Sequence, residues 1–161
     1  MFFFQRVREA IADIERNAGH DRTLVVGDFN TNPFEPEIES ALGLHAISTP
    51  RVGTADFRSI SHQDYPFFYN PMWGCYARQD RPRASYYFNG SDFHEHFWHM
   101  LDQVVLRPSL LPSFPERRLR ILDSAGGTSL VTTSGLPDRA GASDHLPMLF
   151  HVNHLRRSAH A

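Results

Sequence analysis

The chain has 161 residues, of which 41% are hydrophobic and 21% are charged. This length and composition favour one globular domain with a buried core and exclude a disordered chain. The formal net charge of −2 gives no sign of a nucleic-acid partner at the level of the whole chain, which leaves only a local basic surface for that role. No apolar run approaches the roughly 20 residues that cross a bilayer. The single cysteine, Cys75, excludes an internal disulfide framework and suits a cytoplasmic protein.

The first part of the chain predicts a helix followed by a strand. Apolar residues recur at helical spacing over residues 4–18, and Gly19 is suited to ending the helix. The run at 23–27 predicts a strand, and a helix followed closely by a strand indicates an α/β layer arrangement. After a polar turn, Pro33 or Pro36 can begin a short helix that runs through Leu42.

The rest of the chain predicts short strands separated by loops. Residues 50–84 mix proline, glycine and aromatic residues without a sustained period, so they predict a long loop with short elements. Further strands are expected at 85–88, 100–106, 119–123, 129–133 and 147–152. One domain would therefore cover residues 1–153, followed by a frayed tail at 154–161.

Polar residues stand at the ends of three of these strands. Asp28 and Asn30 follow the apolar run at 24–26, Asp102 lies in an otherwise apolar strand, and Asp144 and His145 precede the last strand. Strand ends converge on one edge of a sheet, where ligands bind, so these side chains are expected to meet. Carboxylates, an imidazole and a carboxamide suit phosphoryl chemistry, in which carboxylates hold Mg²⁺ and an imidazole donates to a phosphate oxygen.

Each of these residues also has a purely structural interpretation. Asp28 can cap the loop that follows it, and Asn30 can occupy a turn at positive φ. Asp144 and His145 can begin a turn. Asp102 is harder to explain in this way, because a buried carboxylate needs a partner. The occurrence of all five in this order favours the functional interpretation.

The three stretches GDFNTNP (27–33), HMLDQVVL (99–106) and SDHLPMLFHV (143–152) resemble the last three motifs of the endonuclease/exonuclease/phosphatase superfamily. This DNase-I-like family includes nucleases, inositol phosphatases and sphingomyelinases. The resemblance implies part of a four-layer α/β sandwich and Mg²⁺-dependent, or Mn²⁺-dependent, cleavage of a phosphoester in nucleic acid, phospholipid or a sugar or inositol phosphate.

The resemblance also implies a role for each residue. Asp28 would activate the attacking water, and Asn30 would bind the scissile phosphate and help position Asp28. Asp102 would hold His145, which would contact the phosphate oxygen. Asp144 would lie beside the metal, with Asp28 as the other metal ligand.

The sequence departs from the family pattern in one respect. Family members carry, before the first of these motifs, a strand that ends in asparagine, a glutamate that is the main metal ligand, and a histidine or tyrosine near the phosphate. Here 26 residues precede Gly27 and are expected to form one helix. The chain therefore resembles the C-terminal portion of such an enzyme, and a lone sheet would leave an apolar face in water. A partner chain that supplies the missing half, self-association or an altered fold would cover it.

Two further segments allow two interpretations each. His94 and His96 would share one face of a strand and could bind Zn²⁺, or they could belong to a polar loop before the strand at 100–106. The aromatic residues at 65–88, interleaved with Arg78, Arg81 and Arg83, could stack bases, or could pack the loop on the sheet.

The leading hypothesis is therefore a metal-dependent phosphoesterase. The alternatives are a catalytically inactive fragment that acts as a binding or assembly module, and a natural chain that is longer at its start.

Overall fold

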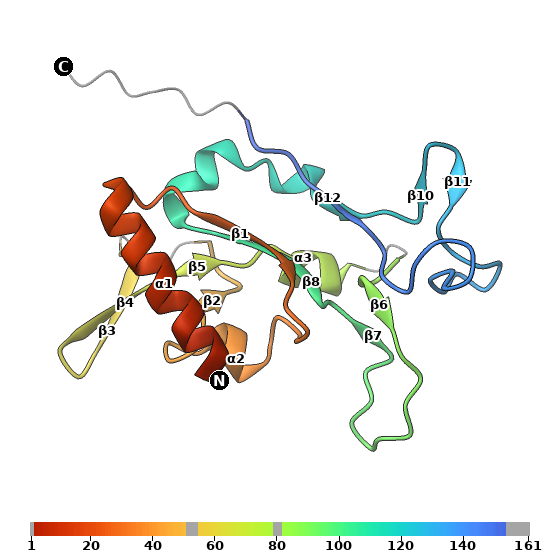
Figure 1. The fold of residues 1–161 in the computed structure, drawn as a ribbon, viewed down its shortest axis with the longest axis horizontal. Coiled ribbons are helices and arrows are strands. Elements are labelled where there is room, and N and C mark those ends of the chain that lie inside the picture. Colours follow the sequence, from red (N-terminus) through yellow and green to blue (C-terminus); the bar gives the residue numbers. More distant parts are fainter. Residues whose placement is uncertain (1, 51–54, 79–81, 154–161) are drawn as a thin grey trace.

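A four-stranded mixed sheet lies at the centre of the domain (Figure 1). The structure is a computed structural model and describes residues 2–50, 55–78 and 82–153. The order of the strands is β1 (Leu24–Asp28), β8 (Asp102–Leu106), β5 (Phe68–Tyr69) and β2 (Ala46–Ile47). β1 and β8 are antiparallel, and β2 and β5 are parallel. The α/β class that the sequence predicts is confirmed.

Two helices cover one face of this sheet. They are α1 (Phe2–Ala18) and α2 (Pro36–Glu39). Side chains alternate between the faces of a strand, so Val25 and Val105 point toward the helices and join a core with Phe4 and Ile11 of α1. The predicted first helix is present over nearly its full length, because its apolar stripe has this face to pack against.

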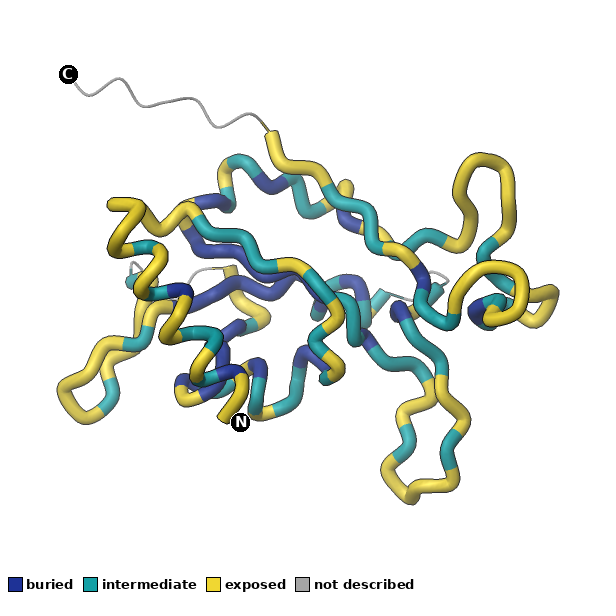
Figure 2. Tube along the Cα trace, in the orientation of Figure 1, coloured by how far each residue is buried: buried dark blue, intermediate teal, exposed yellow. Residues whose placement is uncertain are grey.

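The opposite face of the sheet is also covered. Its cover consists of α3 (Met72–Ala77), η1 (Pro108–Ser113), η2 (Glu116–Arg118), and the paired strands β9 (Arg120–Ile121) and β12 (Met148–Leu149). Val104 and Leu106 point to this side and are fully buried in a core with Met72 and Leu110. Elements of the chain itself therefore cover the centre of both sheet faces, while Val26 on the outer strand β1 stays exposed. Figure 2 shows the buried centre of β8 between the two covers.

Three small two-stranded sheets surround this centre. They are β3 (Phe57–Ile60) with β4 (Gln63–Pro66), β6 (Tyr86–Tyr87) with β7 (Trp98–His99), and β10 (Ser124–Ala125) with β11 (Thr128–Ser129). The segment 50–84 is therefore more regular than predicted, since it holds β3, β4, β5 and α3. No helix in the described ranges is long and apolar enough to cross a membrane. The predicted tail at 154–161 lies outside the described residues.

Several predicted elements are shorter in the structure. The short helix predicted through Leu42 ends at Glu39, and the chain then turns through Ser40 to Gly43. A Cβ atom at Gly43 would lie 2.1 Å from the carbonyl oxygen of Glu37, so only glycine permits this close turn. The strand predicted at 129–133 begins one residue earlier and ends at Ser129.

Candidate functional site

The site begins with two carboxylates on neighbouring strands. Asp28 is the last residue of β1 and lies opposite Asp102, the first residue of β8. The N–H of Phe29 donates to Leu101 O, whereas the N–H of Asp102 points away from β1 and donates to Ser85 Oγ. Asp28 and Asp102 are thus a non-hydrogen-bonded pair, whose Cα atoms lie about 4.5 Å apart. The sequence predicted Asp102 inside a strand at 100–106. In the structure Asp102 is instead the first residue of β8.

His145 approaches Asp102 from the loop before β12. Its Nδ1 lies 2.7 Å from Asp102 Oδ2, and both side chains are about three-quarters buried, with 29% and 25% exposed. The hydrogen bond from His145 gives the Asp102 carboxylate the partner that a largely buried acid needs. With Nδ1 bound to Asp102, Nε2 is the atom that His145 can offer to a substrate.

The backbone of residues 85–86 holds His145 in place. The N–H of Leu146 donates to Ser85 O over 2.7 Å, and Tyr86 forms an isolated β-bridge with His145. The ring centroids of Tyr86 and His145 are 4.8 Å apart. Ser85 is fully buried and bonds to both Asp102 and Leu146, so it joins the two halves of the pair. The sequence predicted a strand at 85–88 but gave Ser85 and Tyr86 no role in the site.

Asn30 lies in a tight turn after β1. Its φ is 54°, and its N–H donates to Asp28 Oδ1 over 2.9 Å. The structural alternatives for Asp28 and Asn30 are therefore both present. These structural roles leave part of each side chain free. Asp28 Oδ2 and the Asn30 carboxamide make no hydrogen bond to any described residue. These free atoms are exposed and available to a ligand.

Asp144 differs from the other predicted residues. Its Oδ2 lies 3.4 Å from Nη2 of Arg139, which also lies 3.3 Å from the hydroxyl of Tyr86. Sequence analysis did not single out Arg139. Its side chain is 60% exposed, so its charge is available near His145.

The carboxylates make an incomplete metal site. In the described part of the chain, no group of three or more His, Cys, Asp or Glu side chains is arranged to hold a metal ion. Mg²⁺ is often bound by one or two carboxylates together with waters and substrate phosphate oxygens. Among the described contacts, Asp144 is joined to Arg139 and Asp28 to the N–H of Asn30, and none joins Asp144 to Asp28. The Zn²⁺ interpretation of His94 and His96 is not supported, because both lie in the loop between β6 and β7.

The aromatic segment is divided between core and site. Phe67, Phe68 and Tyr69 are buried, which agrees with packing on the sheet. Tyr86 instead lies beside His145. Arg81 falls outside the described residues.

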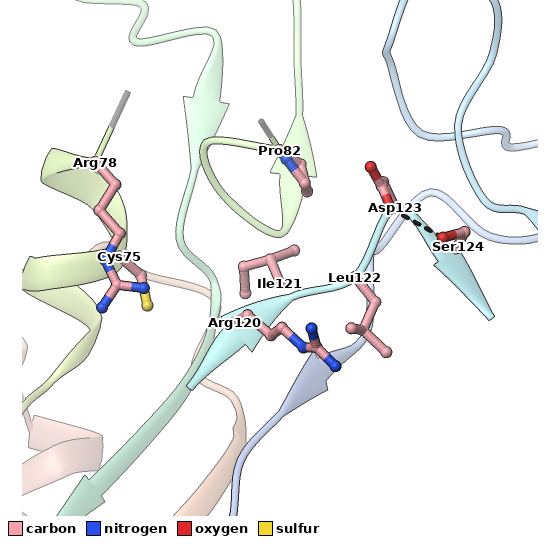
Figure 3. Close-up of a pocket in the computed structure, with 8 residues that line it drawn as sticks. All are labelled: Cys75, Arg78, Pro82, Arg120, Ile121, Leu122, Asp123 and Ser124. Atoms are coloured by element: carbon pink, nitrogen blue, oxygen red, sulfur yellow. Dashed lines mark hydrogen bonds between the residues drawn. The ribbon is translucent and has the colours of Figure 1, made fainter. Parts of the chain in front are cut away.

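A pocket of about 360 Å³ lies elsewhere, between α3 and β9 (Figure 3). It is lined by Cys75 and Arg78 on one side and by residues 120–124 on the other. Burial raises the pKa of the Cys75 thiol, which faces Leu119 O, so Cys75 is a packed thiol rather than a nucleophile. None of the five predicted site residues lines this pocket.

Comparison with protein-family models, curated proteins and solved structures finds no match to this chain. The functional argument therefore depends on the arrangement of the side chains.

Proposed function

We propose that this chain belongs to a metal-dependent phosphoesterase of the endonuclease/exonuclease/phosphatase type. The observation that carries the proposal is the His145–Asp102 hydrogen bond of 2.7 Å, placed beside Asp28 at the end of the β1–β8 pair. Asp102 and His145 are 43 positions apart in the sequence, and Asp28 precedes Asp102 by a still longer stretch. The three residues nevertheless meet at one edge of the sheet. Such convergence of two carboxylates and an imidazole suits hydrolysis by activated water.

The proposal includes the fold and the partners. The central sheet with α1 on one face would be part of a four-layer α/β sandwich, at the C-terminal end of such a domain. The substrate would be a phosphoester in nucleic acid, phospholipid or a sugar or inositol phosphate, in the cytoplasm. The exposed guanidinium of Arg139 and the free carboxamide of Asn30 favour an anionic substrate.

Each residue has a defined part in the proposed reaction. Asp28 would accept a proton from the attacking water through its free Oδ2. Asn30 would bind a phosphate oxygen through its carboxamide, without adding charge. His145, in its doubly protonated form, would donate from Nε2 to the oxygen on which charge develops, while Asp102 accepts from Nδ1 and holds the ring. A bound Mg²⁺ or Mn²⁺, held by Asp28 and Asp144, would supply neutralisation of negative charge on the phosphate.

Hydrolysis of an artificial phosphodiester with Mg²⁺ or Mn²⁺ tests the proposal. We expect metal-dependent turnover that falls by about 10²- to 10⁴-fold in His145→Ala and in Asp28→Ala. His62→Ala is the matched control, because His62 is an exposed histidine in the β3–β4 turn. A folded chain whose turnover equals that of the two variants would support the alternative, a catalytically inactive binding or assembly module.

A further inference from the structure

A second histidine–carboxylate pair lies next to the proposed site. His99 Nε2 is 2.8 Å from Glu95 Oε1, with side-chain exposures of only 20% and 8%. On the other side of the ring, His99 Nδ1 is 3.2 Å from Nδ2 of Asn32. Asn32 is almost fully buried, with 4% of its surface exposed. The three side chains therefore form a continuous line from the β6–β7 loop to the turn after β1.

The hydrogen-bond partners define which groups donate. Asn32 Oδ1 accepts the N–H of Met100 over 2.9 Å, so the Asn32 amide group must donate toward His99. His99 Nδ1 then accepts, and Nε2–H donates to Glu95. The N–H of Phe97 and the ring of His99 lower the pKa of Glu95, which keeps that acceptor ionised. Neutral His99 is thus the form that satisfies all four groups.

This line is connected to the turn that carries Asp28 and Asn30. Asn32 follows Asn30 by two residues and binds both His99 and the backbone of Met100. Thr31 O, between them, accepts a hydrogen bond of 2.6 Å from Gln103. The backbone of the turn is therefore fastened on its inner side, while the free atoms of Asp28 and Asn30 stay outside.

We propose that His99, held by Glu95, is a positioning residue that fixes the Asp28–Asn30 turn through Asn32. This inference rests on the proposed function, because the turn matters for catalysis only if Asp28 and Asn30 act on a substrate. His99 is also the cross-strand partner of Tyr86, whose ring packs against His145. Loss of the His99 contact would therefore disturb the turn on one side and the support of His145 on the other.

The first test follows the turn directly by NMR on the full chain. We expect the side-chain amide signals of Asn32 and the backbone signal of Asn30 to move from their wild-type positions in His99→Phe, which removes the acceptor of the Asn32 amide. His99→Asn keeps an acceptor near the position of Nδ1, so these signals should stay close to their wild-type positions. Signals that do not move in His99→Phe, or that move equally in His99→Asn, would overturn the proposal.

The second test uses turnover. His99→Phe should lower kcat by about 10- to 100-fold with little change in KM, and His99→Asn should restore most of it. His96→Gln is the control, because His96 is an exposed neighbour that makes ring contacts with Phe34 and His99. Equal kcat values for folded His99→Phe and His96→Gln would overturn the positioning role. Absence of turnover in the wild type would contradict the proposed function instead, and the NMR result would still decide the contact.

Discussion

Asp102 forms two bonds that give it a defined orientation. Its N–H donates to Ser85 Oγ, and its carboxylate binds His145 Nδ1. Asp102→Asn keeps the size of the side chain but replaces an anionic acceptor with an amide, so it favours the tautomer that carries no proton on Nδ1. We expect kcat for the phosphodiester to fall by about 10²- to 10⁴-fold, with KM changed much less.

Two controls define the interpretation of that result. Asp92→Asn changes an exposed aspartate whose carboxylate accepts from His94 N within the β6–β7 loop, and its turnover should equal that of the wild type. The double variant Asp102→Asn/His145→Ala should be no slower than His145→Ala alone, because the two residues act as a unit. Additive losses would contradict the pairing.

Sequence reasoning found the residues with unusual chemistry but not their supports. A carboxylate in an apolar strand is visible as a local conflict, which is why Asp102 could be selected. Ser85, Asn32 and Arg139 have ordinary neighbours in the sequence. Their importance comes from contacts across 17, 67 and 53 positions, which no local pattern encodes. Gln103, beside Asp102 in the apolar strand, carried a usable signal that the sequence analysis did not use.

An ion pair connects α1 with the end of β8. Arg107, whose side chain is 3% exposed, donates to both carboxylate oxygens of Glu15 over 2.9 Å. Arg107 also donates to Phe67 O and lies over the Phe68 ring. Glu15→Gln would leave a buried guanidinium without its anionic partner. We expect the free energy of unfolding to fall by about 3 kcal/mol, measured by urea denaturation at neutral pH.

The same pair makes stability depend on pH in a defined direction. Burial alone would raise the pKa of Glu15, but hydrogen bonds from Arg107 and Thr23 outweigh it and hold the pKa below its ordinary value of 4.5. A carboxyl whose pKa is lower in the folded state contributes stability above the unfolded pKa and loses it as pH falls through the folded value. The wild type should therefore lose more stability than Glu15→Gln below about pH 4.5. Glu9→Gln, an exposed change on the same helix, should follow the wild type; equal acid curves for all three would contradict the assignment.

At the level of elements, predictability followed length and burial. α1, β1 and β8 have sustained apolar patterns and were predicted to within about two residues. The two-residue strands β2, β5 and β7 carry too little pattern to be recognised, and tertiary pairing defines them, whereas β6 lies within the strand predicted at 85–88. The parallel pairing of β2 with β5 and the cover on the far sheet face likewise depend on contacts between distant segments.

One long edge of the central sheet stays open. β1 is an outer strand, and alternation of its hydrogen bonds directs the backbone groups of Leu24, Val26 and Asp28 away from β8. No described residue pairs with this edge, and Val26 is 52% exposed. An unpaired apolar strand edge without lysine or proline is a template for another strand. Val26 lies opposite Val104 and points to the same sheet face, so its exposure leaves part of that face open beside the open edge.

α1 adds an apolar stripe beside that edge. Arg8 donates to Ala41 O and Glu15 binds Arg107, so this side of α1 faces the sheet away from β1. Phe3 and Ile14 lie on the opposite flank and are 69% and 65% exposed. Val7, on the same flank, packs against the same buried cluster as Val25 and Phe29 of the β1 segment. The exposed stripe therefore lies on the flank of α1 that faces away from Ala41 and Arg107.

These two features predict a symmetric dimer. An antiparallel pair of β1 strands would place Val26 against Val26 of the second copy, and would bring the two α1 stripes together. Arg6 and Asp13 flank the stripe, so antiparallel helices would place opposite charges face to face.

Sedimentation velocity should show a monomer that converts to a dimer as concentration rises. Val26→Lys should shift the chain to monomer, because a buried lysine at the edge opposes pairing. Phe93→Lys makes the same kind of change at a fully exposed loop residue and should leave the dimer intact. A wild type that stays monomeric at every concentration, or a dimer that both variants weaken equally, would show that a second copy is not what completes this edge.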